Sequence, residues 1–303
     1  MSLEQYVLDH EPTIRLGVFL AVFGIVALWE RFAPRRAPTL SKALRWSSNL
    51  GLVAINTVLL RLIFPLAAVG VAAFAAERGW GLLNHVPLPL WFALPAAVIV
   101  LDLAIWLQHV MTHAVPALWR LHQVHHADMD FDVTTGARFH PIEIALSMGL
   151  KIAVIAALGP SVLAVLSFEI LLNATAMFNH GNVRLPQSLD RVLRWFVVTP
   201  DMHRVHHSID RDESDSNFGF NLPWWDRLFG TYRAQPRAGH TGMTIGLSGH
   251  TDLREVAWLD GMLRMPFRGE ADGDAINRRR WSGQGHPDLP QRPDRLANEH
   301  DRT

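Results

Sequence analysis

The strongest constraint on this chain is a series of long apolar runs separated by polar segments. The first run covers residues 13–30, and others follow at 49–76 and 90–110. A helix needs about 20 mostly apolar residues to cross the hydrocarbon core of a bilayer. A fourth stretch, 142–178, is about twice that length and is broken at Gly159-Pro160, which predicts a hairpin of two short or re-entrant segments. We therefore expect an all-α polytopic membrane protein with about four transmembrane or re-entrant helices.

Composition supports this class and excludes others. Hydrophobic residues make up 49% of the 303 residues and charged residues only 18%, against about a quarter charged in an average soluble domain. The 28 Lys and Arg residues equal the 28 Asp and Glu residues, so no overall basic field favours nucleic acid as a partner. The chain has no cysteine, which excludes disulfides, thiolate metal sites and cysteine nucleophiles.

Basic residues predict the orientation of the spans, because loops rich in Lys and Arg stay in the cytoplasm. Five of them lie between the first and second runs, whereas the next loop holds only Arg78. The third span then ends on the cytoplasmic face near His109, and the hairpin returns to that face near His180. We expect an integral protein of a bacterial inner membrane with a cytoplasmic active site. A cleaved signal peptide is the alternative for residues 13–30, although acidic residues precede them.

Histidines form the second feature of the sequence. Of the 16 histidines, eight fall into three short motifs, HxxxH, HxxHH and HxxHH. Residues three and four apart on a helix share one face, so each motif directs two or three imidazoles toward one place. Their members are His109, His113, His122, His125, His126, His203, His206 and His207.

Eight imidazoles exceed the needs of one metal ion, since zinc takes four ligands and octahedral ions take six. Two metals are therefore expected. Imidazole suits zinc, copper, iron or nickel. A nitrogen-rich site at a membrane face, without the Glu-x-x-His pairs of soluble di-iron bundles, fits two irons that react with O2 beside a lipid. Zinc can replace iron in such a site.

These motifs, in this order, resemble the sterol desaturase and fatty acid hydroxylase superfamily of membrane non-haem di-iron oxidases. Short sequence segments around the motifs also resemble those of the superfamily: RFHPIE at 138–143, NHGN at 179–182, TPDMH at 199–203 and WDRLFGTY at 225–232. The resemblance covers residues 102–232. It implies a helical membrane domain over residues 1–267 with a cytoplasmic cap that holds two irons.

The resemblance also implies the ligands and the reaction. It assigns metal binding to the eight histidines of the motifs and to His180, and makes His140 a possible ligand, a hydrogen-bonding neighbour or a helix-start residue. It implies O2-dependent hydroxylation or desaturation of a lipid C–H bond. Because the sequence carries no dinucleotide motif and no cysteine for an iron–sulfur cluster, electrons must come from a separate reductase, ferredoxin or cytochrome.

The spacing of side chains along the third span predicts which residues orient the histidine ligands. Asp102, Trp106 and His109 lie on one stripe of the third span, so Asp102 is expected to accept an imidazole N–H or, alternatively, to pair with Arg61. Asp201 is a further candidate for this role, as are Asp128, Asp130 and Asp132. The acidic residues at 212, 213 and 215 are expected in a solvated loop.

Two other functions are alternatives to the oxidase. They are a membrane zinc hydrolase and, less favoured, a metal transporter.

The C-terminal part of the chain contains two segments of different character. Residues 251–267 can form an amphipathic helix that lies either on the bilayer or on the protein's own cap. Residues 268–303 have the composition of a disordered polar tail.

Overall fold

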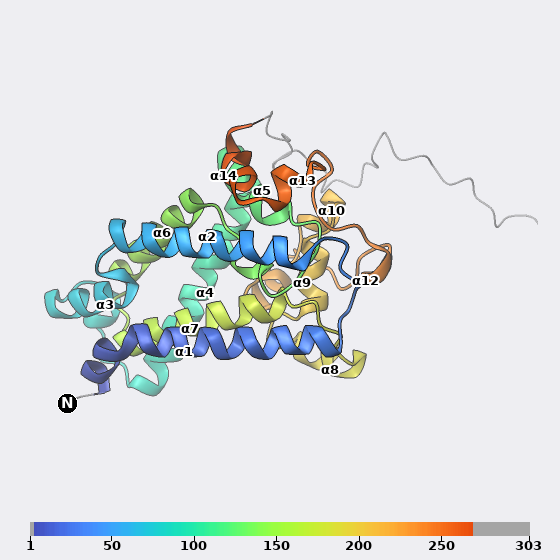
Figure 1. The fold of residues 1–303 in the computed structure, drawn as a ribbon. Coiled ribbons are helices and arrows are strands. Elements are labelled where there is room, and N and C mark those ends of the chain that lie inside the picture. The colour runs from blue at the N-terminus through green and yellow to red at the C-terminus, as the bar shows by residue number, and fades with distance from the viewer. Residues whose placement is uncertain (1–2, 269–303) are drawn as a thin grey trace, which may run out of the picture.

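Long apolar helices dominate the computed structural model, which describes residues 3–268 (Figure 1). Five segments are long and apolar enough to cross a membrane: Glu4–Phe32, Lys42–Arg78, Leu90–Ala114, Pro141–Leu158 and Val162–Asn179. They correspond to α1 (Leu3–Phe32), α2 with α3, α4 (Leu90–Ala114), α6 (Pro141–Leu158) and α7 (Val162–Asn179). The described residues contain no β-strand, only two isolated bridges. The all-α membrane-type fold is confirmed.

The second apolar run, at 49–76, forms two helices rather than one continuous span. It forms α2 (Lys42–Ile63) and α3 (Ala67–Arg78), with Pro65 in the turn between them. Proline lacks the N–H that a helix needs and restricts the preceding residue to extended backbone, so the helix ends there. Helix α3 is short, and its buried alanines Ala68 and Ala72 pack in a core with α4, α6 and α7.

The hairpin predicted at 142–178 is confirmed as α6 and α7. Helix α6 ends at Gly159, whose φ of 66° is the left-handed conformation that glycine adopts without strain. The side chain of Ser161 then caps α7 by accepting a hydrogen bond from the backbone N–H of Ala164. Helix α1 packs along α7 and α2 packs along α6.

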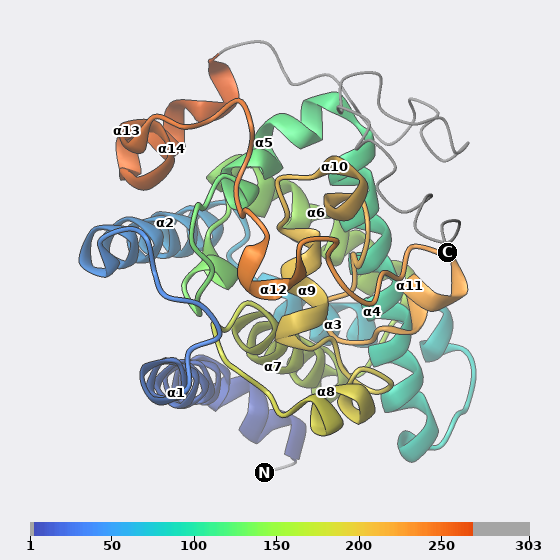
Figure 2. The same ribbon diagram turned by 90° about the vertical axis from the view of Figure 1, so that its right-hand side faces the viewer.

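The histidine-bearing elements gather at one end of this bundle (Figures 1 and 2). They are the end of α4, α5 (Pro116–His126), the end of α7 and α9 (Pro200–His206). Short helices surround them: η2 (Thr135–Ala137), α8 (Gln187–Leu193), α10 (Arg211–Ser214), α11 (Trp224–Leu228) and α12 (Gly239–Gly242). Another short helix, η1 (Leu82–Asn84), follows α3. All the histidine motifs thus lie on the same side of the apolar bundle.

Residues 251–267 form a broken structure rather than one amphipathic helix. The pieces are α13 (Leu253–Ala257), α14 (Leu259–Arg264) and η3 (Met265–Phe267). Val256, Met262 and Met265 are buried against Leu52 of α2 and Val124 of α5. The segment therefore packs on the protein's own cap, which was one of the two alternatives. The predicted disordered tail lies outside the described residues, apart from Arg268.

Candidate metal centre

The local sequence explains how each element presents its imidazoles. His109 and His113 are four residues apart near the end of α4, and so share one face of that helix. Pro116 starts α5 directly afterwards, and Thr199 caps α9 by accepting a hydrogen bond from the N–H of Met202. His180 caps the C-terminal end of α7.

The structure brings all nine predicted ligands together, in two groups. Within each group, the ligand nitrogens lie within 4.8 Å of one another, and all nine side chains are buried. The first group consists of His109, His113, His122, His126 and His206. The second consists of His125, His180, His203 and His207.

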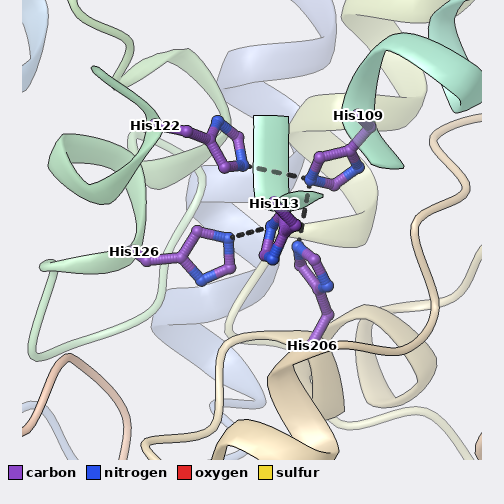
Figure 3. Close-up of side chains that lie close together, drawn as sticks. All are labelled: His109, His113, His122, His126 and His206. Carbon is purple, nitrogen blue, oxygen red and sulfur yellow. Dashed lines mark hydrogen bonds between the residues drawn. The ribbon is translucent and has the colours of Figure 1, made fainter. Parts of the chain in front are cut away.

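In the first group the Nε2 atoms converge on one point (Figure 3). The Nε2 of His109 lies 3.1 Å from that of His122 and 3.0 Å from that of His206. His113 and His126 make the same contact with each other at 3.1 Å. Two nitrogens bound at right angles to one metal, each at about 2.1 Å, lie about 3.0 Å apart. The spacing therefore fits a shared metal ion.

The other ring nitrogens show that these contacts are not ordinary hydrogen bonds. His109 donates from Nδ1 to the carbonyl of Phe218, and His206 donates from Nδ1 to the carbonyl of Ser216, both at 2.7 Å. A carbonyl only accepts, so Nδ1 carries the hydrogen and Nε2 of each neutral ring presents a lone pair. Two lone pairs at 3.0 Å repel unless a cation lies between them. The donor set thus fits a metal.

The second group repeats this pattern. His180 donates from Nδ1 to the carbonyl of Ala176 at 2.7 Å, and His125 donates to the carbonyl of Arg138 at 3.3 Å. Their Nε2 atoms face each other at 3.1 Å. The Nε2 atoms of His203 and His207 lie 3.1 and 3.2 Å from that of His180.

Burial keeps the imidazoles of His125, His180 and His206 neutral, which metal binding requires. It lowers the pKa of His180 to about 3, and burial together with the neighbouring His122 lowers the pKa of His206 to about 3. Burial also lowers the pKa of His125 well below its usual value. At neutral pH these rings are available as ligands rather than as cations.

Two carboxylates that sequence reasoning did not assign hold ligands of the first group. Glu143 accepts a hydrogen bond from Nδ1 of His122 at 2.6 Å, and Asp215 contacts Nδ1 of His113 at 3.3 Å. The expectation that the acidic run at 212–215 is a solvated loop is therefore wrong for Asp215, and also for the buried Glu213. The only sequence signal for the role of Glu143 beside His122 was its position in the segment RFHPIE at 138–143.

Asp102 and Trp106 act differently from the prediction. Asp102 contacts neither a histidine ligand nor Arg61; it accepts a hydrogen bond from the indole of Trp225 at 2.8 Å. Trp106 donates to Asp226 at 3.0 Å. Because Trp225 and Asp226 lie far along the chain, the stripe on α4 did not reveal these partners. Both residues secure the segment that contains Asp226.

Asp226 is the centre of that segment and connects it to the metal centre. Its Oδ1 accepts hydrogen bonds from the backbone N–H of Phe218 at 2.9 Å and from the hydroxyl of Thr231 at 2.8 Å. Its Oδ2 accepts from the backbone N–H of Gly219 at 2.9 Å. Phe218 in turn offers its carbonyl to His109. Asp226 therefore fixes the peptide that orients a predicted ligand.

Asp201 and His140 also lie away from the ligand contacts. Asp201 pairs with Arg35 and Arg204, and its carboxylate holds no imidazole of the two groups. His140 belongs to neither group. Its Nδ1 accepts a hydrogen bond from the N–H of Ile142 at 3.2 Å and so caps α6, as the helix-start alternative predicted.

The three aspartates between α5 and η2 hold α2 instead of imidazoles. Asp128 receives two hydrogen bonds from Arg45, at 2.8 and 2.7 Å, and Asp132 also pairs with Arg45. Asp130 accepts from the backbone N–H groups of Thr39 and Leu40, just before α2. The predicted contact of these aspartates with the ligands is therefore wrong.

A cavity of about 250 Å³ extends from the first group into the apolar bundle. Its walls come from α1, α2, α4, α6 and α7, and His109 and His122 line one part of it. Apolar side chains such as Phe19, Met148 and Phe220 supply much of the wall. We refer to this space as the intramembrane cavity. A largely apolar space therefore lies directly beside these histidines.

Fold and site together define a class of protein: a helical, membrane-type bundle with a buried, histidine-rich centre suited to two metals. Residues 94–231, the region that carries these histidines, match the fatty acid hydroxylase family. Through this region the chain is similar to the sterol desaturase and fatty acid hydroxylase superfamily.

The chain is also similar to named enzymes. It is 28% identical to ornithine lipid hydroxylase OlsE of Rhizobium tropici over 77% of this chain and 70% of that protein. It is 31% and 30% identical to the alkylglycerol monooxygenases of Xenopus tropicalis and Homo sapiens, over 45% and 51% of this chain. These matches cover only 29% and 33% of the two monooxygenases. No solved structure gives a significant match. The names of these relatives are those of a lipid hydroxylase and of monooxygenases.

Proposed function

We propose that this protein is a membrane-bound lipid hydroxylase with two irons, held by the two histidine groups. The observation that carries the proposal is the close approach of the Nε2 atoms of His109 and His206. Each of these rings donates its Nδ1–H to a backbone carbonyl, so both Nε2 atoms present a lone pair. The first group offers five imidazoles and the second four. Since octahedral ions take six ligands, each ion retains room for a non-protein ligand.

Bound iron would supply the activation of O2, and the residues of the chain would supply position and exclusion of water. The carbonyls of Phe218, Ser216 and Ala176 fix the ring planes through Nδ1. Phe139 stacks on His125, with ring centroids 4.5 Å apart, and shields that ring. The carboxylate of Glu143 holds the Nδ1–H of His122 and so leaves Nε2 of that ring for a metal.

The intramembrane cavity supports a lipid as the substrate. It lies among the apolar spans and ends at His109 and His122, so a chain that enters from the bilayer reaches the first group without crossing water. The relatives' names, ornithine lipid hydroxylase and alkylglycerol monooxygenase, agree with a lipid substrate.

Hydroxylation of a C–H bond by O2 consumes two electrons and two protons and releases one water for each alcohol formed. The histidine and carboxylate side chains of the site cannot supply these electrons. We therefore propose that they come from a separate reductase with a ferredoxin or cytochrome. The basic loop between α1 and α2 supports a cytoplasmic location of the centre. A reporter fused after Thr231 should behave as cytoplasmic and one fused near Gly81 as external; the opposite result would reverse this topology.

The test of the reaction is a turnover assay with isotopically labelled O2. The purified, iron-loaded chain, supplied with a reductant, is given lipid extract in nanodiscs, and the products are analysed by mass spectrometry. Incorporation of one labelled oxygen atom per product supports hydroxylation. A product with two hydrogens fewer and no label would make the enzyme a desaturase. His206→Ala is the inactive control. Absence of any lipid product from protein with a full metal content would refute the proposed function.

A further inference from the structure

The wall of the intramembrane cavity holds a group of charges that the metal centre does not explain. Arg15 of α1, Lys151 of α6 and Glu169 of α7 all line it. Glu169 accepts from Lys151 at 2.7 Å through Oε1 and from Arg15 at 2.8 Å through Oε2. The Glu169 side chain is only 1% exposed. Glu11 of α1 pairs with Arg15, and we call these four residues, Glu11, Arg15, Lys151 and Glu169, the Lys151 cluster.

Charged groups inside spans are costly and usually mark a functional site. A mere clamp between helices would use up the donors of the cluster, but donors remain. The Lys151 ammonium has three N–H groups, and its one hydrogen bond within residues 3–268 is the one to Glu169. Gln108 also lines the cavity, where its amide oxygen accepts from Ser147 and leaves its NH₂ group for another partner. The cavity wall thus presents spare hydrogen-bond donors.

The net charge of the cluster indicates the kind of ligand. Glu169 balances Lys151, and Glu11, 2.7 Å from Arg15, balances that arginine. Two cations and two carboxylates leave no net charge. Spare donors without net charge suit an uncharged polar group with acceptor oxygens, such as hydroxyl, ether or ester oxygens. A carboxylate would lack a free counter-charge.

The position of the cluster relative to the histidines gives the binding a consequence. On α6, Glu143 beside His122 and Lys151 are eight residues apart, which corresponds to about 12 Å along the helix. Met148 and Leu172 line the cavity as well and are apolar. A lipid whose polar group binds Lys151 would therefore hold a chosen part of its chain near His109 and His122.

We propose that the Lys151 cluster binds the uncharged polar group of an amphipathic lipid and so determines which lipid, and which carbon, reaches the histidine centre. The inference rests on the proposed function. Lys151 is in this account a specificity-determining residue, since it contacts the substrate away from the reacting carbon.

Binding to the full-length protein in detergent, without O2 or reductant, tests the proposal independently of the reaction. The probes are a radiolabelled alkylglycerol and an n-alkane of matched chain length. Lys151→Met should weaken alkylglycerol binding about tenfold or more, because a charge-assisted hydrogen bond is lost, and should leave alkane binding unchanged. Lys151→Arg should retain most of the affinity. Arg61→Met, an exposed basic residue of α2 outside the cavity, is the matched control and should bind both probes normally.

A second variant keeps the test decisive if Lys151→Met fails to fold. Glu169→Gln leaves the cluster cationic, so affinity for a fatty acid of matched length should rise about tenfold. An equal loss of both probes in Lys151→Met would make the cluster a structural clamp and overturn the proposal, as would unchanged alkylglycerol binding or no gain of fatty acid affinity in Glu169→Gln. Normal binding without turnover would instead count against the proposed function.

Discussion

Asp226→Asn is the change that most sharply tests how the cap holds the metal centre. The buried carboxylate accepts four hydrogen bonds, from Trp106, Phe218 and Thr231 at Oδ1 and from Gly219 at Oδ2. An asparagine offers one oxygen and one NH₂ group, so in either orientation its NH₂ faces at least one backbone N–H.

The magnitude follows from that mismatch. Leaving one buried donor unsatisfied costs about 1–3 kcal/mol, which should appear as lower stability of the metal-free protein. Loss of the hydrogen bond to its N–H also lets the Phe218 peptide move, so that its carbonyl no longer orients His109. The loss of such an orienting contact weakens metal binding by about 10- to 100-fold. The metal-loaded protein should therefore lose more stability than the metal-free protein.

The assay combines denaturant unfolding of both forms with metal retention against a chelator. Asp212→Asn is the matched control, since Asp212 is an exposed acid on the same cap and its ion pair with Arg237 lies at the surface. Equal losses in the two forms would show that Asp226 supports the fold without orienting His109. Wild-type values in both would refute the reasoning.

Three other changes test separate parts of the structure. Glu143→Gln keeps a hydrogen-bond acceptor for His122 but removes the charge, so metal retention should fall about tenfold or more; unchanged retention would remove Glu143 from this role. Asp128→Asn leaves buried Arg45 without its bidentate partner and should destabilise the protein by roughly 3 kcal/mol, and a change below 1 kcal/mol would contradict that. Burial lowers the pKa of His180 and His206 to about 3, whereas unfolded histidine titrates near pH 6.5. Stability should therefore be full above about pH 6.5 and fall as the pH drops from there toward 3, and a denaturation midpoint that stayed constant between pH 7 and pH 5 would contradict this.

The parts of the fold that depend on local sequence could be predicted. Helical spacing alone groups His122, His125 and His126 on one turn, and glycine with proline at 159 and 160 ends a helix wherever it occurs. The break at Pro65 was equally local, but a long apolar run concealed it.

The contacts that orient the ligands could not be predicted, because they join distant residues. Trp106 meets Asp226 across 120 residues, and Glu143 meets His122 across 21. Asp102 lies on the predicted stripe of α4, yet its partner Trp225 comes from a cap segment whose position depends on the tertiary fold. Residues 251–267 illustrate the same limit, since their apolar face fitted both a bilayer and the cap.

The central claim is that two metal ions bind, one to each histidine group. Its most direct test is the iron content per chain of the purified, iron-loaded protein, compared with three single variants. We expect about two ions in the wild type and in His140→Ala, since His140 caps α6, and about one in His206→Ala and in His125→Ala, which each remove a ligand from a different group. A wild-type content of one ion, or undiminished binding in both of the last two variants, would contradict the claim.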